Sequence, residues 1–447
     1  MAGLNSLKPL IPIAYWLILN LNTGLALATP LSYRIYTLPA ILLPAYASFR
    51  TINYLTFPAG LSAIYGYIVL IGLFHFTSLL YIKKWTVRSD RDKDDKSHSN
   101  SLWCRFARLP WKKIYRIVCN PRLINITQDD VEGLREDQKL TSTRRPVSKR
   151  TLYRCAIGWL IHVFVMPSIF PSAFVPFRPD EFAPTHQVFF RRLLSLVSSG
   201  TANPPNIRET LLRAVFTVYS FWGTLLILDT TVQVFMAPFW IYVARVSEHR
   251  DWPDLNGSPL EAYTLGRFWS RFWHRLHVPG YLDFSRVLID LLPRKIRENK
   301  FIRTTLTQFL FFLFSGTVHM LVSLQLGDTC AYITDIWFYM ASFGGLFLEG
   351  LILKYFNGKP QSKSSAELEK EKAQEASGKK PSTQSYKHVS VAWRCIGYIW
   401  VFGFFFWTVP KFNYPKVQCA IEAEIVRQRR AQAMASLMFG GRKAGST

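Results

Sequence analysis

Long apolar stretches alternate along this chain with shorter polar segments that are crowded with Lys and Arg. An apolar stretch of about 20 residues with few charges is long enough to cross a bilayer as a helix. We expect spans at residues 10–28, 57–82, 151–170, 211–228, 232–246, 301–326, 333–353 and 393–409. The pattern therefore predicts an all-α, polytopic integral membrane protein with about seven to nine transmembrane helices and interfacial amphipathic helices.

Three apolar segments are irregular. Residues 10–28 end in Ala-Leu-Ala, so a cleaved signal peptide is one interpretation, and we favour a retained anchor. Residues 38–49 contain two prolines and indicate an interfacial or broken segment. Residues 232–246 are short for a crossing, so they either cross or enter the membrane and return.

These patterns divide the chain into five parts. The polar loop contains the run LPWKKIYRIVCNPRLI, whose apolar positions predict a short helix lying on the membrane. The later linker is rich in Lys, Glu, Ser and Gln, which predicts disorder. The parts are N-terminal spans (1–82), a basic polar loop with an interfacial helix (83–150), a membrane core (151–356), a disordered linker (357–388), and a last span with a surface tail (389–447).

The run RFWSRFWHRLH at residues 267–277 has the clearest pattern of the chain. Its aromatic residues and Leu276 fall on one arc of a helix, while its arginines and histidines fall on the other. The run therefore predicts an amphipathic helix at a membrane interface. The spacing places Arg267, Arg271 and Arg275 in a row that suits an anion such as phosphate, and lipid headgroups are the alternative partner.

If all three apolar segments between residues 151 and 246 crossed, this helix and the basic loop 83–150 would face opposite sides. We therefore expect residues 232–246 to be re-entrant and both basic regions to face the cytosol. The sequons at Asn125 and Asn256 would report the side on which each lies.

His319 lies in the middle of the apolar run LFSGTVHMLV. An imidazole without a partner in lipid is costly, so an intramembrane histidine indicates a functional site, with a histidine that only packs helices as the alternative. Ser315 and Ser323, one turn before and after, predict a polar stripe that faces a cavity or another helix. Gly316 predicts a close approach there.

Composition and short motifs argue against several other classes of protein and of site. The chain is 49% hydrophobic and 19% charged, with a net charge of +25. Because the basic residues lie between apolar spans, membrane topology and anionic lipid explain them, and nucleic acid is not expected as a partner. The six scattered cysteines indicate neither a disulfide framework nor a metal site. His274 and His277 form one HxxH pair, too little for a metal centre, and no phosphate-binding glycine motif is present.

The run RFWSRFWHRLH, the later SGTVH and the upstream CNPR together resemble the wax-synthase-like branch of the membrane-bound O-acyltransferase superfamily, from about Arg105 to Val409. Fungal members of that branch include acetyltransferases that modify terpenoids and meroterpenoids. The family usually has glycine after Asn-Pro-Arg, where this chain has Leu123.

The resemblance implies an acyl-CoA donor, acetyl-CoA in this branch, as a co-substrate rather than a permanently bound cofactor, and a hydrophobic alcohol as acceptor. It also implies that His319 is the catalytic base, because a neutral imidazole can accept the proton of the alcohol. His274, with Trp273, is the candidate donor to the developing oxyanion. The donor site is assigned to Arg267, Arg271, Arg275, Trp269 and Trp273, and the expected location is the endoplasmic reticulum.

Two alternatives remain open at this point. A wax-ester synthase acting on long-chain alcohols would share the motifs. A transporter or scaffold, in which His319, Asp335 and Glu349 form an ion or proton relay, would use the same intramembrane polar residues.

Overall fold

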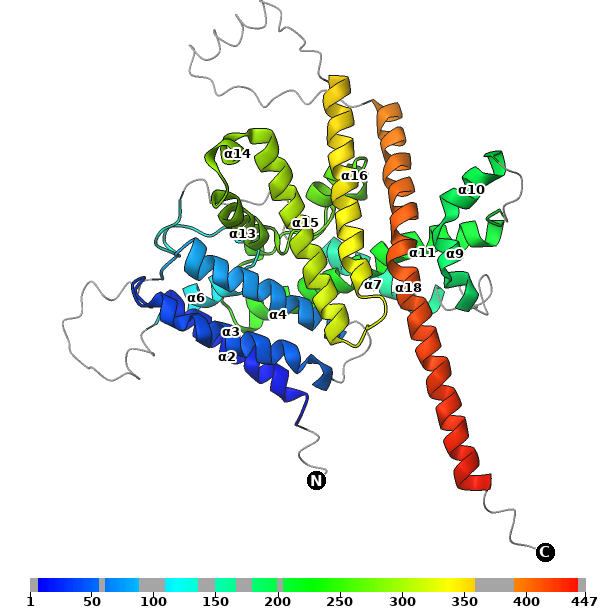
Figure 1. Cartoon of the computed structure of the whole chain (residues 1–447). Helices are drawn as coiled ribbons and strands as arrows, with labels where there is room; N and C mark the ends of the chain where they lie inside the picture. The colour runs from blue at the N-terminus through cyan, green and yellow to red at the C-terminus, as the bar shows by residue number, and fades with distance from the viewer. Residues whose placement is uncertain are drawn as a thin grey trace, which may run out of the picture.

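The computed structural model describes residues 7–55, 61–87, 109–135, 149–165, 179–198, 204–357 and 390–440 (Figure 1). Almost all regular structure in these residues is helical, and Thr86 and Glu132 form an isolated antiparallel bridge. The all-α prediction is therefore confirmed. Apart from residue 357, the predicted disordered linker lies outside the described residues.

The longer helices follow the apolar stretches of the sequence. They are α2 (Leu10–Leu27), α3 (Leu38–Arg50), α4 (Leu61–Thr77), α6 (Trp111–Val118), α7 (Lys149–Leu160), α10 (Phe189–Ser198), α11 (Ile207–Asp229), α13 (Val278–Asp290), α15 (Lys300–Gln325), α16 (Ile333–Asn357) and α18 (Val391–Gly440). The short ones are α9 (Pro184–Gln187), α12 (Leu265–Arg267) and α14 (Arg294–Glu298). Turns of π-helix extend several of them, namely η3 (Ser78–Ile82), η6 (Ile161–Val165), η8 (Thr230–Met236), η9 (Phe239–Val243) and η12 (Phe268–Phe272).

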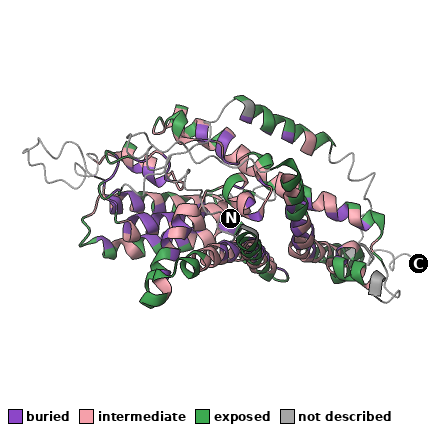
Figure 2. Cartoon of the chain, turned by 90° about the horizontal axis from the view of Figure 1, so that it is seen from above, coloured by how far each residue is buried: buried purple, intermediate pink, exposed green. Residues whose placement is uncertain are grey.

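Six helices among the described residues are long and apolar enough to cross a membrane: Leu10–Leu27, Leu61–Ile82, Ile207–Val243, Lys300–Gln325, Ile333–Tyr355 and Val391–Met434. A shorter apolar helix covers Thr151–Val165. Large apolar side chains are exposed on the outer helices, for example Leu43 (67%) and Ile399 (72%), and green positions run along the long helices in Figure 2. Such exposure suits contact with lipid and supports a multi-pass membrane protein.

The predicted separate segment at residues 232–246 is wrong. Residues 207–243 form one continuous helical stretch, so this part of the chain does not turn back as a re-entrant segment. Asp229, where the sequence suggested a break, accepts a hydrogen bond from Asn256 Nδ2 (2.9 Å). The helix continues past Asp229 because the carboxylate has a partner and the residues that follow form π-helical turns.

The expected last span (393–409) and the tail that follows it belong to one helix, because α18 runs unbroken through Pro410 and Pro415. Proline removes the N–H that would bond to the carbonyl four residues earlier. For Pro410 this carbonyl belongs to Phe406, and the buried Arg213 of α11 donates to it from Nε (2.8 Å). A long-range contact thus replaces the missing helical hydrogen bond.

The short helix α6 is present as predicted, but its apolar face packs on α2 rather than on lipid. Ile114 and Ile117 are buried in a cluster with Leu19 and Ala26 of α2. A side chain at Gly24 would lie only 2.8 Å from the Ile114 side chain, so glycine there lets the two helices touch.

Two hydrophobic clusters hold the molecule together. The N-terminal cluster is mainly aliphatic and joins α2, α3, η3, α6 and the residues that follow α6. The aromatic cluster joins the segment 262–273 to α15, α16 and α18, with Phe268, Phe338 and Phe405 among its buried members. Cys330 and Cys419 form a disulfide that ties the α15–α16 connection to α18. The scattered cysteines had indicated no disulfide, because 89 residues separate this pair.

Candidate active site

The run 267–277 does not form the predicted amphipathic helix. Helical structure covers α12 and η12 and ends at Trp273, whose backbone is extended. The carboxylate of Glu349 on α16 accepts hydrogen bonds from the backbone N–H groups of Leu265 (2.7 Å) and Gly266 (2.9 Å). Capping a helix start with a carboxylate stabilises it, so Glu349 fixes this segment against α16.

The early end of the helix separates the three arginines. Arg267 forms an ion pair with Glu261 and lies over the ring of Tyr263. Arg271 is exposed in η12, and Arg275 is exposed beyond the break. The predicted row of arginines on one helix face is therefore absent, and none of the three lines the cavity described next.

A cavity of about 510 Å³ lies between the two clusters, which is in the usual range for a small-molecule site. Its walls come from α2, α4, α6, α11, η8, α13, α15 and α16 and from the segment 273–277. The polar side chains that line one part of it are Tyr67, His274, His277, Tyr281, Ser315, His319 and Tyr339. The structure thus brings the two histidine motifs, more than 40 positions apart, into a single cavity.

His319 lines this cavity as the sequence predicted. Its Nε2 is hydrogen-bonded to the hydroxyl of Tyr339 on α16 at 2.7 Å. The ring of Tyr67 packs against the imidazole, with centroids 4.5 Å apart. Ser315 also lines the cavity, but Ser323 does not: it accepts a hydrogen bond from Lys416 Nζ (3.0 Å).

His277 is a second cavity histidine. Its Nε2 lies 3.3 Å from Ser315 Oγ, and its ring is 4.6 Å from that of Tyr281 and 5.4 Å from that of His274. Burial lowers the pKa of His277 from 6.5 to about 4, because the surroundings cannot solvate an imidazolium. His277 is therefore a neutral imidazole at physiological pH.

The two predicted tryptophans lie in different places. Trp273 lines the cavity, whereas Trp269 packs in the aromatic cluster against Phe312 and Phe405 and is not among the residues that line the cavity. The ring of Trp273 is 5.2 Å from that of His274.

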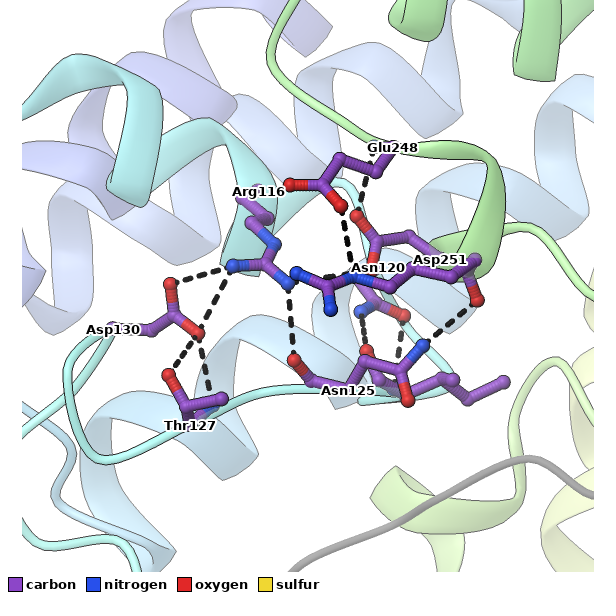
Figure 3. Close-up of polar contacts among 9 residues, drawn as sticks. Arg116, Asn120, Asn125, Thr127, Asp130, Glu248 and Asp251 are labelled. Carbon is purple, nitrogen blue, oxygen red and sulfur yellow. Dashed lines mark hydrogen bonds and ion pairs between the residues drawn. The ribbon is translucent and has the colours of Figure 1, made fainter.

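The CNPR run lines another part of the same cavity through Asn120 and Arg122, together with Arg116 of α6. Figure 3 shows Arg116 between two carboxylates, Asp130 (2.9 Å) and Asp251 (3.3 Å). Burial opposes the charge of Arg116, but the two carboxylates outweigh it and raise the pKa of the guanidinium. The arginine thereby joins the CNPR segment to the loop that precedes residues 265–273.

Leu123 has a φ of +51°, a backbone conformation that glycine adopts easily and leucine does not. The glycine usual at this place in the resembling family would relieve that strain. Here the leucine side chain is buried in the N-terminal cluster, so its packing offsets a conformational cost of about 1 kcal/mol.

Two hydrogen bonds show how the described part of the basic loop lies relative to the residues before Arg267. Arg122 donates to Pro253 O (3.0 Å) and Asn125 Nδ2 donates to Arg250 O (2.8 Å), so the described part of the loop 83–150 lies beside the residues that lead into Arg267. The side of the membrane that the two regions face stays a prediction. Asn256 is only 7% exposed and its amide bonds Asp229, so its sequon cannot serve as a glycosylation probe of the folded chain.

The acidic residues proposed for a relay are engaged elsewhere. Asp335 forms an ion pair with Lys416 (2.7 Å), and Glu349 holds α12 and accepts a hydrogen bond from Trp400. Neither is among the residues that line the cavity with His319. Within the described part of the chain, no group of three or more His, Cys, Asp or Glu side chains could hold a metal ion.

Sequence reasoning missed Tyr339, Tyr67 and the part that His277 plays. Tyr339 is one of 20 tyrosines, and nothing in its local sequence distinguishes it. Gly316 was the available signal, because a close helix approach beside a histidine implies that the facing helix supplies the next contact.

Comparison with known proteins confirms the resemblance. Residues 252–341 match the model of the membrane bound O-acyl transferase family, a stretch that contains both histidine motifs and ends two residues after Tyr339. The CNPR run lies outside that match, so the family match is shorter than the predicted resemblance. No solved structure matches.

Several fungal acetyltransferases are similar to this chain. The acetyltransferase ataH of Aspergillus terreus is 25% identical over 174 residues, which is 38% of this chain and 48% of that protein. The acetyltransferase aurG of Calcarisporium arbuscula is 28% identical over 46% of this chain and 44% of its own length. The acetyltransferase spyB of Aspergillus fumigatus is 26% identical over 32% of this chain and 24% of its own length. The matched region thus spans at most about half the length of these relatives.

Proposed function

We propose that this chain is an O-acyltransferase that moves an acetyl group from acetyl-CoA to a hydroxyl of a hydrophobic acceptor. The observation that carries the proposal is the convergence of His274, His277 and His319 in one cavity within the membrane core. The family match over the same residues, and the similarity to fungal acetyltransferases, support acyl transfer and an acetyl donor.

The reaction needs a base beside the acceptor hydroxyl and a hydrogen-bond donor beside the thioester oxygen. His319 takes the hydroxyl proton, the alcohol oxygen attacks the thioester carbon, and the C–S bond breaks. The proton then passes to the CoA thiolate, which leaves as the free thiol. His274 is the proposed donor to the oxyanion that forms in between.

The acyl donor and the alcohol acceptor are assigned on different grounds. Arg271 and Arg275 are exposed on a segment whose neighbours Trp273 and His274 line the cavity, and we assign them to the phosphates of CoA. Arg267 is already paired with Glu261, so its contribution is to hold the segment. The acceptor is a polycyclic alcohol of the terpenoid or meroterpenoid class, an assignment that rests on the resemblance, and the membrane is that of the endoplasmic reticulum.

The test is to incubate membranes that contain the chain with acetyl-labelled CoA and two separate alcohol pools, one of polycyclic terpenoid alcohols and one of long-chain primary alcohols. We expect labelled ester from the polycyclic pool, with release of one CoA thiol for each ester formed. Ester from the long-chain pool alone would identify a wax-ester synthase instead. No ester from either pool, with purified chain that still binds both substrates, would contradict acyl transfer.

A further inference from the structure

The hydrogen bond between His319 and Tyr339 constrains how the histidine can act. Tyr339 Oη lies 2.7 Å from Nε2 of the imidazole, and within the described residues Nδ1 has no hydrogen-bond partner. Both side chains line the cavity. The nitrogen that remains available to a substrate hydroxyl is therefore Nδ1.

The helix contact that produces this bond depends on Gly316. A side chain there would lie 3.0 Å from Ile336 Cα and 3.2 Å from Tyr339 Cβ. The absence of a side chain lets α15 and α16 approach closely enough for Tyr339 to reach a histidine three residues further along α15. The ring of Tyr339 also packs against Trp269 and Phe338, which fixes its direction.

A neutral imidazole carries its proton on only one nitrogen, and only the other can accept a proton. If the phenol donated to Nε2, the proton would sit on Nδ1, and the cavity would face a donor instead of a base. If Nε2–H donates to the phenol oxygen, Nδ1 keeps its lone pair toward the cavity. Only the second arrangement lets His319 deprotonate an alcohol.

We propose that Tyr339 is a positioning residue that accepts a hydrogen bond from Nε2–H of His319 and so presents Nδ1 as the base. This inference rests on the proposed acyl transfer. During the reaction the alcohol O–H bond breaks and an N–H bond forms on Nδ1, while the bond between Nε2–H and the phenol oxygen strengthens because the imidazole becomes cationic. Nδ1 then returns the proton to the CoA thiolate, and Tyr339 keeps its own proton throughout.

The test compares Tyr339→Phe with the wild-type chain and with His319→Gln in a double-mutant cycle on kcat. Phenylalanine keeps the ring and removes only the hydroxyl. We expect kcat to fall roughly 10- to 1000-fold while KM for both substrates stays within a few fold, because binding is intact and the base nitrogen is no longer fixed. In the His319→Gln background, Tyr339→Phe should have almost no further effect.

The matched control is Tyr414→Phe. Tyr414 is buried in α18 and packs against Phe182 and Phe216, away from the residues that line the cavity, and this variant should keep wild-type kcat. Gly316→Ala should reproduce the kcat loss with both side chains still present, because it pushes α16 away from α15.

The outcomes separate this inference from the proposed function. Wild-type kcat in Tyr339→Phe, with His319→Gln inactive, would overturn the positioning role and leave acyl transfer intact. An equal, independent loss from Tyr339→Phe in the His319→Gln background would also overturn it, because the tyrosine would then act directly. Full activity in His319→Gln would contradict the catalytic role of His319 on which the inference rests.

Discussion

His75 and His319 both lie in apolar helices, yet their surroundings differ. His75 is 3% exposed, and its Nε2–H donates to the backbone carbonyl of Ile117 at 3.0 Å, which joins α4 to α6. His319 is bonded to a side chain, and its second nitrogen has no partner among the described residues; the cavity that it lines is also lined by His75, His274 and His277. A histidine in a membrane helix is therefore a structural residue where a backbone carbonyl satisfies it, and a candidate catalyst where one nitrogen remains available.

After His319 itself, the largest effect in this comparison should come from His274, which shares the cavity with His319 but not its tyrosine. His274→Ala should lower kcat by about 10²–10³, the usual loss when one donor to an oxyanion is removed. His162→Ala is the control, because His162 bonds Tyr219 in another part of the molecule and should keep activity within a few fold. Activity of His274→Ala close to that of the wild type would remove this residue from the mechanism.

The next effect concerns stability and His277. Its folded-state pKa of about 4 lies below the ordinary 6.5, so the unfolded chain binds more protons between these values. The contribution of His277 is thus constant above pH 6.5 and becomes unfavourable as the pH falls toward 4, by about 3 kcal/mol in total. Unfolding midpoints in detergent should show a shallower acid loss for His277→Asn than for the wild type. Parallel curves would mean that His277 is solvated in the folded state.

A smaller effect is expected for the donor site, where Arg271 is compared with an arginine of α14. Arg271→Gln should raise the apparent KM for acetyl-CoA roughly 10- to 100-fold, since a charged hydrogen bond contributes about 1.5–3 kcal/mol. The KM for the alcohol should be nearly unchanged. Arg294→Gln removes a charge from the exposed helix α14 and should change neither value. Equal weakening for both substrates would favour lipid headgroups as the partner of Arg271.

The smallest effect tests the structural half of the comparison. His75→Leu leaves the Ile117 carbonyl without this donor and should destabilise the chain by about 1–3 kcal/mol. Activity per folded molecule should remain, because His75 lines the cavity but its Nε2–H is already bonded to a backbone carbonyl. The measurement is the thermal midpoint together with activity normalised to folded protein. A specific loss of kcat with an unchanged thermal midpoint would mean that His75, like His319, takes part in the reaction.

The sequence could identify His319, Ser315 and Gly316 because each departs from an apolar helix, and such departures are costly in lipid. It could not predict the short helical segment that begins at Leu265 and ends at Trp273. The contact that fixes this segment comes from Glu349, 84 positions from Leu265. The continuity of α18 through Pro410 likewise depends on Arg213, 193 positions from Phe406. Local patterns thus predicted the elements and the polar residues, whereas their ends and partners depended on contacts distant in sequence.

The most direct test of the central claim, that His319 is the base, is transfer of label from acetyl-CoA to the alcohol by His319→Ala. Binding of acetyl-CoA is measured on the same preparation. We expect transfer to fall by about 10²–10⁴ while acetyl-CoA still binds and the protein still accumulates in membranes. Transfer near the wild-type rate would contradict the mechanism, and the polar residues of α15 would then need another explanation.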